Sequence, residues 1–333
     1  MTVAVVGAGA LGRTFAAGLV AAGGSVTLGA TTRSLDELRS AGAVRIHGGL
    51  DLEIPVADGA GTSGVLGLVR TAEIDEADGL VFATKAHQLH DAIAATGPLT
   101  PEWVLGLQNG IGKDDVLTAA FGSPRVLRCV TTVAAERRPD GEVTVSNLGA
   151  TYVGELDPLV SDRATAVAMM FATAGLRTEA RSDLAQITWS KAANVAGTFG
   201  VDLLTRASWV DAMESEHLTR IFLGLAREVA LLAAADGAPV EDYPGLPAKS
   251  YATAPPEASI EARRERIRQM RAGGASLDRR SSLQQDLALG RETEAEVIFG
   301  ELVDRADLHG LEVPRLELVR DVARAHAARQ TAR

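Results

Sequence analysis

A glycine-rich turn near the N-terminus is the first feature whose residue types and spacing could do chemistry. The chain reads Gly7-Ala8-Gly9-Ala10-Leu11-Gly12 directly after the apolar run Val3–Val6 and before a run with helical periodicity. Gly7 permits a tight turn, Gly9 lets the backbone approach a pyrophosphate, and Gly12 lets a helix pack close to a strand. We therefore predict a dinucleotide site at a helix N-terminus, rather than a coincidental glycine-rich turn. Its expected contacts are Gly7, Gly9, Ala10, Leu11 and Gly12.

The end of the second predicted strand indicates which dinucleotide the site prefers. An NAD site places an acid about 20 residues beyond the glycines, where it binds the ribose 2′-hydroxyl. Here the chain reads Leu28-Gly29-Ala30-Thr31-Thr32-Arg33, without an acid. Thr31 and Arg33 could bind a 2′-phosphate, whereas the alternative is that Arg33 starts the next helix in solvent. We predict NADPH/NADP as the cofactor.

Two polar segments follow later predicted strands. Lys85 and His87 come after the run Leu80–Ala83, and Asn109 comes after Val104–Leu107. Ligands of open α/β sheets bind at the carboxyl ends of parallel strands. Lys85 could position cofactor or substrate charge, and Asn109 could hydrogen-bond a carboxamide or a substrate oxygen. The plain alternatives are a surface lysine and a turn asparagine, and His87 is read as a loop residue.

These residues need elements to position them, and the pattern predicts two domains. Up to about residue 110, short β-rich runs alternate with helical ones, which is typical of a parallel sheet. The later runs Val130–Ala134, Glu142–Ser146 and Thr151–Gly154 are predicted as antiparallel strands that extend this sheet. After Arg181 helical periodicity takes over. The predicted fold class is α/β: an N-terminal Rossmann-type dinucleotide-binding domain (1–180) followed by an all-α C-terminal domain (181–333).

Helix signals divide the second domain. Asp183 is the expected N-cap of its first helix, and the segment from Tyr243 to Arg280 is read as a loop plus an exposed helix. Gly290 is a plausible C′ residue. Thr293 is the expected N-cap of a helix that starts at Glu294, with Glu296 at N3.

Composition limits the partners of this chain. The 333 residues include 33 Lys+Arg and 43 Asp+Glu, a net charge of −10, which argues against nucleic acid or an anionic membrane as partner. The single cysteine, Cys129, forms no internal disulfide, and no metal site is expected. Neither a signal peptide nor a spanning helix is recognised, so a cytoplasmic protein is expected. The expected partner is a small-molecule substrate, with a homodimer left open.

Taken in order, the motifs resemble the ketopantoate reductase family. The resemblance rests on the glycine motif, Lys85, Asn109-Gly110, Trp189-Ser190-Lys191, Ser281-Ser282-Leu283-Gln284-Gln285-Asp286 and Thr293-Glu294. It covers nearly the whole chain. It implies a Rossmann domain, a helical C-terminal domain and NADPH-dependent reduction of the 2-keto group of ketopantoate to pantoate, a step of pantothenate biosynthesis.

The resemblance also implies roles for individual residues. Lys191 would be the general acid, Glu294 its partner and Ser282 a contact of the substrate carboxylate. Asn109 and Lys85 would contact cofactor and substrate. The family usually places an asparagine four residues after the lysine, whereas this chain has Val195 there and Asn194 one position earlier. Both offsets lie on one helix face, so Asn194 is a candidate substrate contact. The family's second downstream asparagine is absent.

The chemistry of a ketone reduction supports these roles independently. Hydride delivered to a ketone leaves a developing alkoxide, which needs a proton donor and nearby positive charge. The Lys191 ammonium could supply both, and Glu294 in the first turn of its helix could keep it charged. Three alternatives stay open: reduction of another ketone or imine in specialised metabolism, a protein that senses NADPH without turnover, and an exposed helix lysine without a role.

Overall fold

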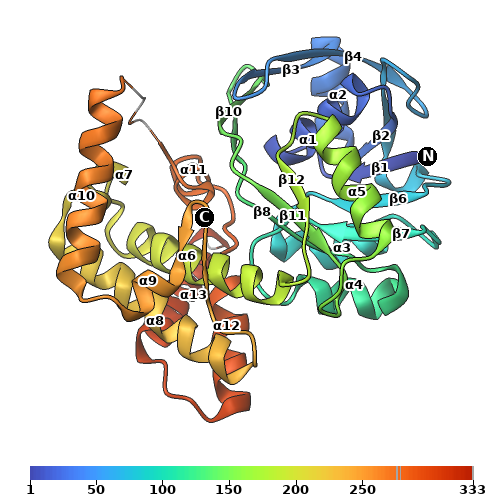
Figure 1. Cartoon of the computed structure of the whole chain (residues 1–333). Coiled ribbons are helices and arrows are strands. Elements are labelled where there is room, and N and C mark those ends of the chain that lie inside the picture. The colour runs from blue at the N-terminus through green and yellow to red at the C-terminus, as the bar shows by residue number, and fades with distance from the viewer. Residues whose placement is uncertain (275–276, 278, 332–333) are drawn as a thin grey trace. The chain divides into compact units, whose positions relative to one another are not determined.

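The computed structural model describes residues 1–274, 277 and 279–331, and these fall into two compact units (Figure 1). The first, here called the sheet unit, comprises Met1–Gln108 and Gly112–Leu184. The second, the helical unit, comprises Asn109–Ile111 and Ala185–Arg333. The short segment that carries Asn109 therefore belongs to the helical unit, although it follows a strand of the sheet unit.

The sheet unit alternates strands and helices, as the sequence pattern predicts. Its strands are β1 (Thr2–Val6), β2 (Ser25–Ala30), β3 (Ala43–Gly48), β4 (Leu52–Asp58), β5 (Leu66–Arg70), β6 (Gly79–Phe82), β7 (Trp103–Gly106), β8 (Arg128–Thr131), β9 (Ala134–Arg137), β10 (Val143–Asn147), β11 (Thr151–Gly154) and β12 (Thr178–Ala180). Its helices are α1 (Ala10–Ala21), α2 (Thr32–Ala41), α3 (Leu89–Ala95), α4 (Lys113–Phe121) and α5 (Asp162–Thr173), with short 3₁₀ turns η1 (Thr71–Glu73), η2 (Ala86–Gln88) and η3 (Ser123–Arg125).

The main sheet has the strand order β7-β6-β1-β2-β5-β4-β3-β10-β9. Strands β7 to β4 in this order are parallel, and in Figure 1 β1 runs between β2 and β6. The expected extension of this sheet is only partly right. β9 and β10 do extend it, but β8, β11 and β12 form a separate three-stranded sheet. That sheet is fixed by β11, which pairs with β8 on one side and β12 on the other.

Successive side chains of β1 pack into hydrophobic clusters on opposite faces of the main sheet. Val5 packs in a cluster with Phe15 of α1 and Phe171 of α5, whose rings meet edge to face with centroids 5.3 Å apart. Val6 points the other way, into a cluster that includes Leu117 of α4. Helices thus cover both faces, as parallel sheets require, and the predicted Rossmann-type fold is confirmed.

The helical unit consists of helices apart from one short hairpin. Its elements are α6 (Leu184–Thr205), α7 (Trp209–Glu214), α8 (Glu216–Ala235), β13 (Asp242–Tyr243), β14 (Leu246–Pro247), α9 (Ala248–Thr253), α10 (Pro256–Ala272), α11 (Ser282–Ala288), α12 (Ala295–His309) and α13 (Pro314–Thr331). The first residue of α6 belongs to the sheet unit. The predicted helical C-terminal domain is confirmed, and its hairpin β13–β14 consists of two strands of two residues each. The helix α10 is the expected exposed helix, with one face buried around Ile260 and Ile267.

Glycines let α6 and α8 approach closely. A Cβ added to Gly197 would lie 2.5 Å from Phe222, and one added to Gly200 would lie 2.2 Å from Leu225. Both distances are below van der Waals contact, so larger residues would push the helices apart. The buried helix pair holds α6, and with it Lys191, in one orientation.

The structure defines the starts of α12 and α11. The helix α12 begins at Ala295 with Glu294 as its N-cap residue, one position later than expected, and Glu294 has no side-chain cap hydrogen bond. The N-cap of α11 is Ser281, in a capping box with Gln284. Gly290 has φ +64°, as a C′ glycine should. None of the described helices is both long and apolar enough to span a membrane.

Candidate functional site

The glycine turn joins β1 to α1 in the arrangement that the sequence predicts. Gly7 has φ +113°, and a Cβ there would lie 2.9 Å from the backbone of Ala83. A Cβ on Gly12 would lie 1.8 Å from the carbonyl oxygen of Gly7, so the helix can pack against the turn only without a side chain. Gly9 is the N-cap of α1 without a side-chain cap, which leaves the first amides of the helix, those of Ala10 to Gly12, to face an anion.

The buried side chain of Arg13 stabilises this turn through hydrogen bonds to backbone carbonyl oxygens. It is 2 % exposed, and its Nε donates to the carbonyl oxygen of Ala8 at 2.9 Å while Nη1 donates to that of Gly141 at 2.8 Å. The pKa of Arg13 is lowered to about 10, chiefly by burial and next by the charge of Arg137, while the charge of Glu37 opposes both effects. Arg13 therefore stays protonated at neutral pH and adds positive charge behind the glycine turn.

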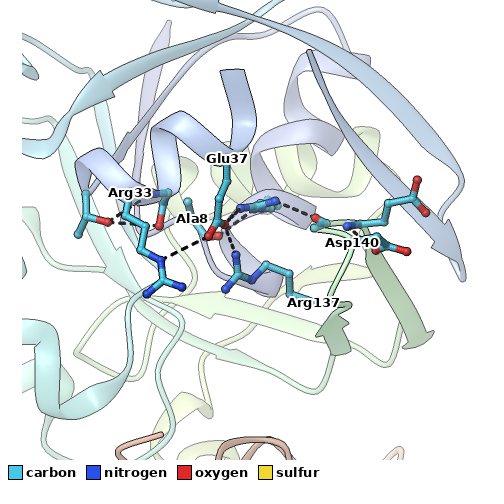
Figure 2. A network of polar contacts seen from close by, with 10 residues as sticks. Ala8, Arg33, Glu37, Arg137 and Asp140 are labelled. Atoms are coloured by element: carbon cyan, nitrogen blue, oxygen red, sulfur yellow. Dashed lines mark hydrogen bonds and ion pairs between the residues drawn. The ribbon is translucent and has the colours of Figure 1, made fainter. Parts of the chain in front are cut away.

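The carboxylate of Glu37 on α2 lies close to two further arginines, Arg33 of α2 and Arg137 of β9 (Figure 2). Glu37 pairs with Arg33 at 3.6 Å and with Arg137 at 2.5 Å, and Arg13 lies 3.7 Å from the same carboxylate. The Arg33 side chain is 91 % exposed, so it can turn toward a ligand. Thr31, the N-cap of α2, accepts from the amide of Ser34. Arg137 of β9 escaped the sequence reasoning because its position beside α2 depends on a contact between residues 100 apart.

The loops after β6 and β7 carry Lys85 and Asn109. Lys85 is half-buried at the N-cap of η2, and His87 lies within that turn. Gln108 is buried and donates to the carbonyl oxygen of Phe82 at 3.2 Å, which ties the two strand ends together. These loops end neighbouring strands, as expected for the carboxyl edge of a parallel sheet.

Glu301 of α12 holds the loop that carries Asn109. The amide of Ile111 donates to Oε2 of Glu301 at 3.0 Å. Gly110 has φ +101°, and a Cβ there would lie 2.7 Å from the same carboxylate oxygen. The carboxylate thus packs against the backbone of the Asn-Gly turn. No signal in the sequence marks Glu301, because its partner lies 190 residues away.

Lys191 and Asn194 lie half-buried along one side of α6. Residues three apart on a helix are neighbours on its surface. The residues just before Lys191 anchor the helix: Trp189 is 5 % exposed in the core, and the buried hydroxyl of Ser190 accepts from the amide of Glu241 at 2.9 Å. The Trp-Ser-Lys sequence therefore presents the lysine from a fixed helix.

Glu294 and Ser282 occupy the starts of two other helices of the same unit. Glu294 is 4 % exposed at the N-cap of α12, where the helix dipole favours a negative charge. Ser282 is the first residue of α11 and is half-buried, while Ser281 supplies the helix cap.

Asp202 links α6 to the start of α11, and no local sequence signal marks it, because Ser281 lies 79 residues away. It is 3 % exposed and accepts from Ser281 Oγ at 2.6 Å and from Gln284 Nε2 at 2.9 Å. Burial raises the pKa of Asp202 to about 6, against the lowering effect of the Ser281 hydrogen bond. These contacts explain Ser281 and Gln284 as residues that position α11.

The structure thus divides the candidate residues between the two units. The sheet unit carries the glycine turn, Thr31, Arg33 and Lys85. The helical unit carries Asn109, Lys191, Asn194, Ser282 and Glu294. Across the described residues, no three or more His, Cys, Asp or Glu side chains are grouped so as to hold a metal ion.

Comparison with known proteins gives the family. The family model "Ketopantoate reductase PanE/ApbA" matches residues 3–158, and its C-terminal counterpart matches residues 183–327. The chain belongs to the ketopantoate reductase family. Ketopantoate reductases are oxidoreductases that act on a CH–OH group and use NADPH, and the residues of the glycine turn and of the Lys191 helix lie within the two matched segments.

Individual relatives agree with this family. A 2-dehydropantoate 2-reductase of Archaeoglobus fulgidus is 30 % identical over 310 residues, covering 93 % of this chain and 92 % of the relative. A D-mandelate dehydrogenase solved with NADH and anilino(oxo)acetate superposes with a TM-score of 0.81 at 19 % identity, covering 99 % of this chain and 100 % of the other. A dimeric ketopantoate reductase from Staphylococcus aureus gives 0.71 at 18 %, covering 99 % and 100 %. These two likenesses concern the fold.

Proposed function

We propose that this protein reduces a 2-keto acid to a 2-hydroxy acid with NADPH, and that ketopantoate, reduced to pantoate, is its first candidate substrate. The observation that carries the proposal is that the helical unit holds Lys191 on an anchored helix together with a buried carboxylate, Glu294, at a helix N-terminus. A binding protein without turnover has no need of a proton donor. The names of the relatives support ketopantoate as the substrate.

The sheet unit has the features that NADPH needs. The open amides at the start of α1 fit a pyrophosphate, since a Cβ at Gly9 would find Ala83 no nearer than 3.9 Å. Thr31 and Arg33, with Arg137 beside them, offer hydroxyl and guanidinium groups to a 2′-phosphate. Lys85 and Asn109 would contact the cofactor and substrate beyond these groups. We propose that residues 1–180 form the NADPH-binding domain and that residues 181–333 form the domain that binds the substrate and carries out catalysis.

Lys191 would act as the proton donor. NADPH, when bound, would supply the hydride for the keto carbon, and the oxygen of that group would gain negative charge. The Lys191 ammonium stabilises this charge and gives up a proton to the oxygen. Glu294 would keep Lys191 protonated before the reaction, because an opposite charge favours the ammonium form.

The remaining polar residues would hold the substrate. Ser282 at the first turn of α11 would bind the substrate carboxylate with its hydroxyl, aided by the amides of that helix start. Asn194 would bind a substrate oxygen from the same face of α6 as Lys191. Asn109 would do so from the loop held by Glu301.

A direct assay tests the proposal. NADPH oxidation is followed at ~340 nm, the absorbance band of reduced nicotinamide, against a panel of 2-keto acids that includes ketopantoate. We expect turnover of at least one 2-keto acid, with ketopantoate reduced fastest if the family's substrate is retained. Tight NADPH binding without turnover of any member would contradict the reductase and favour a sensor or an imine substrate.

We also propose that the chain forms a homodimer. The support is the dimeric state named for the S. aureus protein. Sedimentation velocity of the purified protein would distinguish a dimer from a monomer.

A further inference from the structure

A cavity of about 160 Å³ lies within the helical unit, next to the face of α6 that carries Lys191. The helix α6 contributes Asn194, Thr198 and Asp202 to its wall. Because these residues are spaced by four, they lie on one side of the helix, and Lys191 precedes Asn194 on that side by about one turn. The cavity wall therefore begins about one helical turn beyond the proposed catalytic lysine and continues along α6 away from it.

Three arginines, Arg263, Arg266 and Arg279, line this cavity. Arg263 is 6 % exposed; its Nη2 donates to the carbonyl oxygen of Ala212 at 3.1 Å, and its guanidinium lies 4.3 Å from the ring centroid of Phe222. Across the described residues its buried Nε has no hydrogen-bond partner. A buried donor without an acceptor costs free energy, which a ligand oxygen would recover.

The other two arginines lack the pairing that their neighbours have. On α10, the helix that carries Arg266, Arg268 forms an ion pair with Glu261 at 2.5 Å. Within the part of the chain that the structure describes, neither Arg266 nor Arg279 has an acidic partner, and the Arg279 guanidinium lies 5.4 Å from the ring centroid of Trp209. Burial lowers the pKa of Arg279, and the charge of Arg266 lowers it further. The two guanidinium groups repel each other, and an anion between them would remove that repulsion.

The carboxylate in the wall does not neutralise these arginines. Asp202 directs its two oxygens to Ser281 Oγ and to Gln284 Nε2. Its hydrogen bonds are thus used to position α11, and the guanidinium groups outnumber it in the same cavity. The cavity therefore carries net positive charge, and it adjoins the helix that bears the proposed catalytic residue, Lys191.

We propose that this cavity binds the carboxylate or phosphate group of a small organic molecule through Arg263, Arg266 and Arg279. An engineered cavity of about 150 Å³ holds benzene, so a ligand of similar size fits here. The bound carboxylate or phosphate can belong to either of two molecules. It is either the far end of the 2-keto acid, in which case this inference rests on the proposed function and the substrate carries a second negative charge, or a separate small anion bound beside the substrate.

Calorimetry on the full chain tests the site without relying on catalysis. The probes are glutarate and inorganic phosphate in a buffer of low ionic strength. We expect at least one of them to bind, and Arg266→Gln or Arg279→Gln to weaken that binding about tenfold or more, as for loss of a charge-assisted hydrogen bond. Arg268→Gln is the matched control, because it removes the same charge from the same exposed helix outside the cavity. Failure of both probes to bind, or an equal loss in Arg268→Gln, would overturn the inference.

Kinetics then assign the source of the anion. If it belongs to the substrate, Arg266→Gln raises the ratio of the KM for 2-oxoglutarate to the KM for 2-oxopentanoate about tenfold. If it is a separate anion, phosphate changes the rate with 2-oxopentanoate in the unaltered protein, and Arg266→Gln weakens that effect. Reduction of ketopantoate without binding of either probe would refute the cavity and leave the proposed function standing. Binding of glutarate through Arg266 without reduction of any 2-keto acid would support the cavity and refute the reductase.

Discussion

At the scale of single residues, Lys191 separates an enzyme from a binding protein. We expect Lys191→Ala to lower kcat by ~10²–10⁴, the usual contribution of a positioned acid, while NADPH binding stays nearly unchanged. Steady-state kinetics and a fluorescence titration with NADPH measure the two effects. Lys249→Ala is the matched control, since Lys249 is an exposed lysine of the same unit, paired with Glu241 at 3.0 Å.

Glu294 should act with Lys191 as one unit. We expect Glu294→Gln to lower kcat in the same direction, and the double variant to lose far less than the product of the two single effects. Simple multiplication of the effects would argue against a shared role. Unchanged turnover by a folded Lys191→Ala protein would leave water or another group as the proton donor.

Asp202 should make the stability of the protein depend on pH. Burial raises its pKa from the ordinary 3.8 to about 6, so folding favours the protonated form. Protonated Asp202 therefore adds about 2–3 kcal/mol to the free energy of unfolding below pH ~4. This contribution decreases as the pH rises from about 4 to about 6, and it is absent at higher pH. Urea unfolding of Asp202→Asn between pH 4 and 7 should lack this decline, whereas the exposed Asp211→Asn should keep it. Parallel curves for Asp202→Asn and the unaltered protein would contradict the assignment.

At the scale of elements, Glu301 couples α12 to the loop that carries Asn109. Glu301→Ala leaves the Ile111 amide without this acceptor, so we expect kcat/KM to fall about tenfold as the loop loosens. Glu301→Gln keeps an acceptor oxygen and should retain most of the activity. In an Asn109→Ala background, Glu301→Ala should add little, because a positioning residue has nothing left to position. Equal losses in both backgrounds would make Glu301 a purely structural residue.

Arg33 in the first turn of α2 and Arg137 of β9 should select the cofactor. Arg33→Ala and Arg137→Ala should each weaken NADPH about ten- to a hundredfold and leave NADH nearly unchanged, because NADH has no 2′-phosphate for a guanidinium to bind. Titration of each variant with both cofactors measures this. Arg39→Ala is the control: Arg39 lies on the same helix but is held by Asp36 and Asp58. Equal affinity of the unaltered protein for NADH and NADPH would refute the assignment.

The elements also show which parts of the site can be predicted from the sequence. The turn from β1 through Gly7 and Gly12 to α1 is a local structure, so its glycine spacing specifies it directly. The Lys191 helix is equally local, because helical periodicity shows where it begins and which residues share its face. The family resemblance supplied the roles that periodicity could not.

What could not be predicted depends on contacts between distant residues. Glu301 reaches Ile111 across 190 residues, Ser281 reaches Asp202 across 79, and Arg137 reaches Glu37 across 100. No local pattern encodes such pairs, because packing of whole elements brings them together. The separate sheet of β8, β11 and β12 was missed for the same reason: strand runs indicate strands, while their partners are chosen by tertiary packing.

At the scale of the whole molecule, cofactor and anion should protect different units. The proposed NADPH groups lie mainly in the sheet unit, and the arginine cavity lies in the helical unit. A ligand at 100 times its Kd stabilises the form that binds it by about 2.7 kcal/mol. We expect hydrogen exchange to slow in peptides of β1 and α1 when NADPH is added, and in peptides of α10 when glutarate is added.

Arg266→Gln is the control for that experiment, because it should abolish the protection of α10 by glutarate and leave the protection of α1 by NADPH intact. The distinction follows from linkage: a ligand protects the amides whose opening destroys its own site. If each ligand protected both units equally, the units would open together and the division of the chain into separately stabilised parts would be wrong. Protection of α10 by NADPH and of α1 by glutarate would instead reverse the assignment of the two sites.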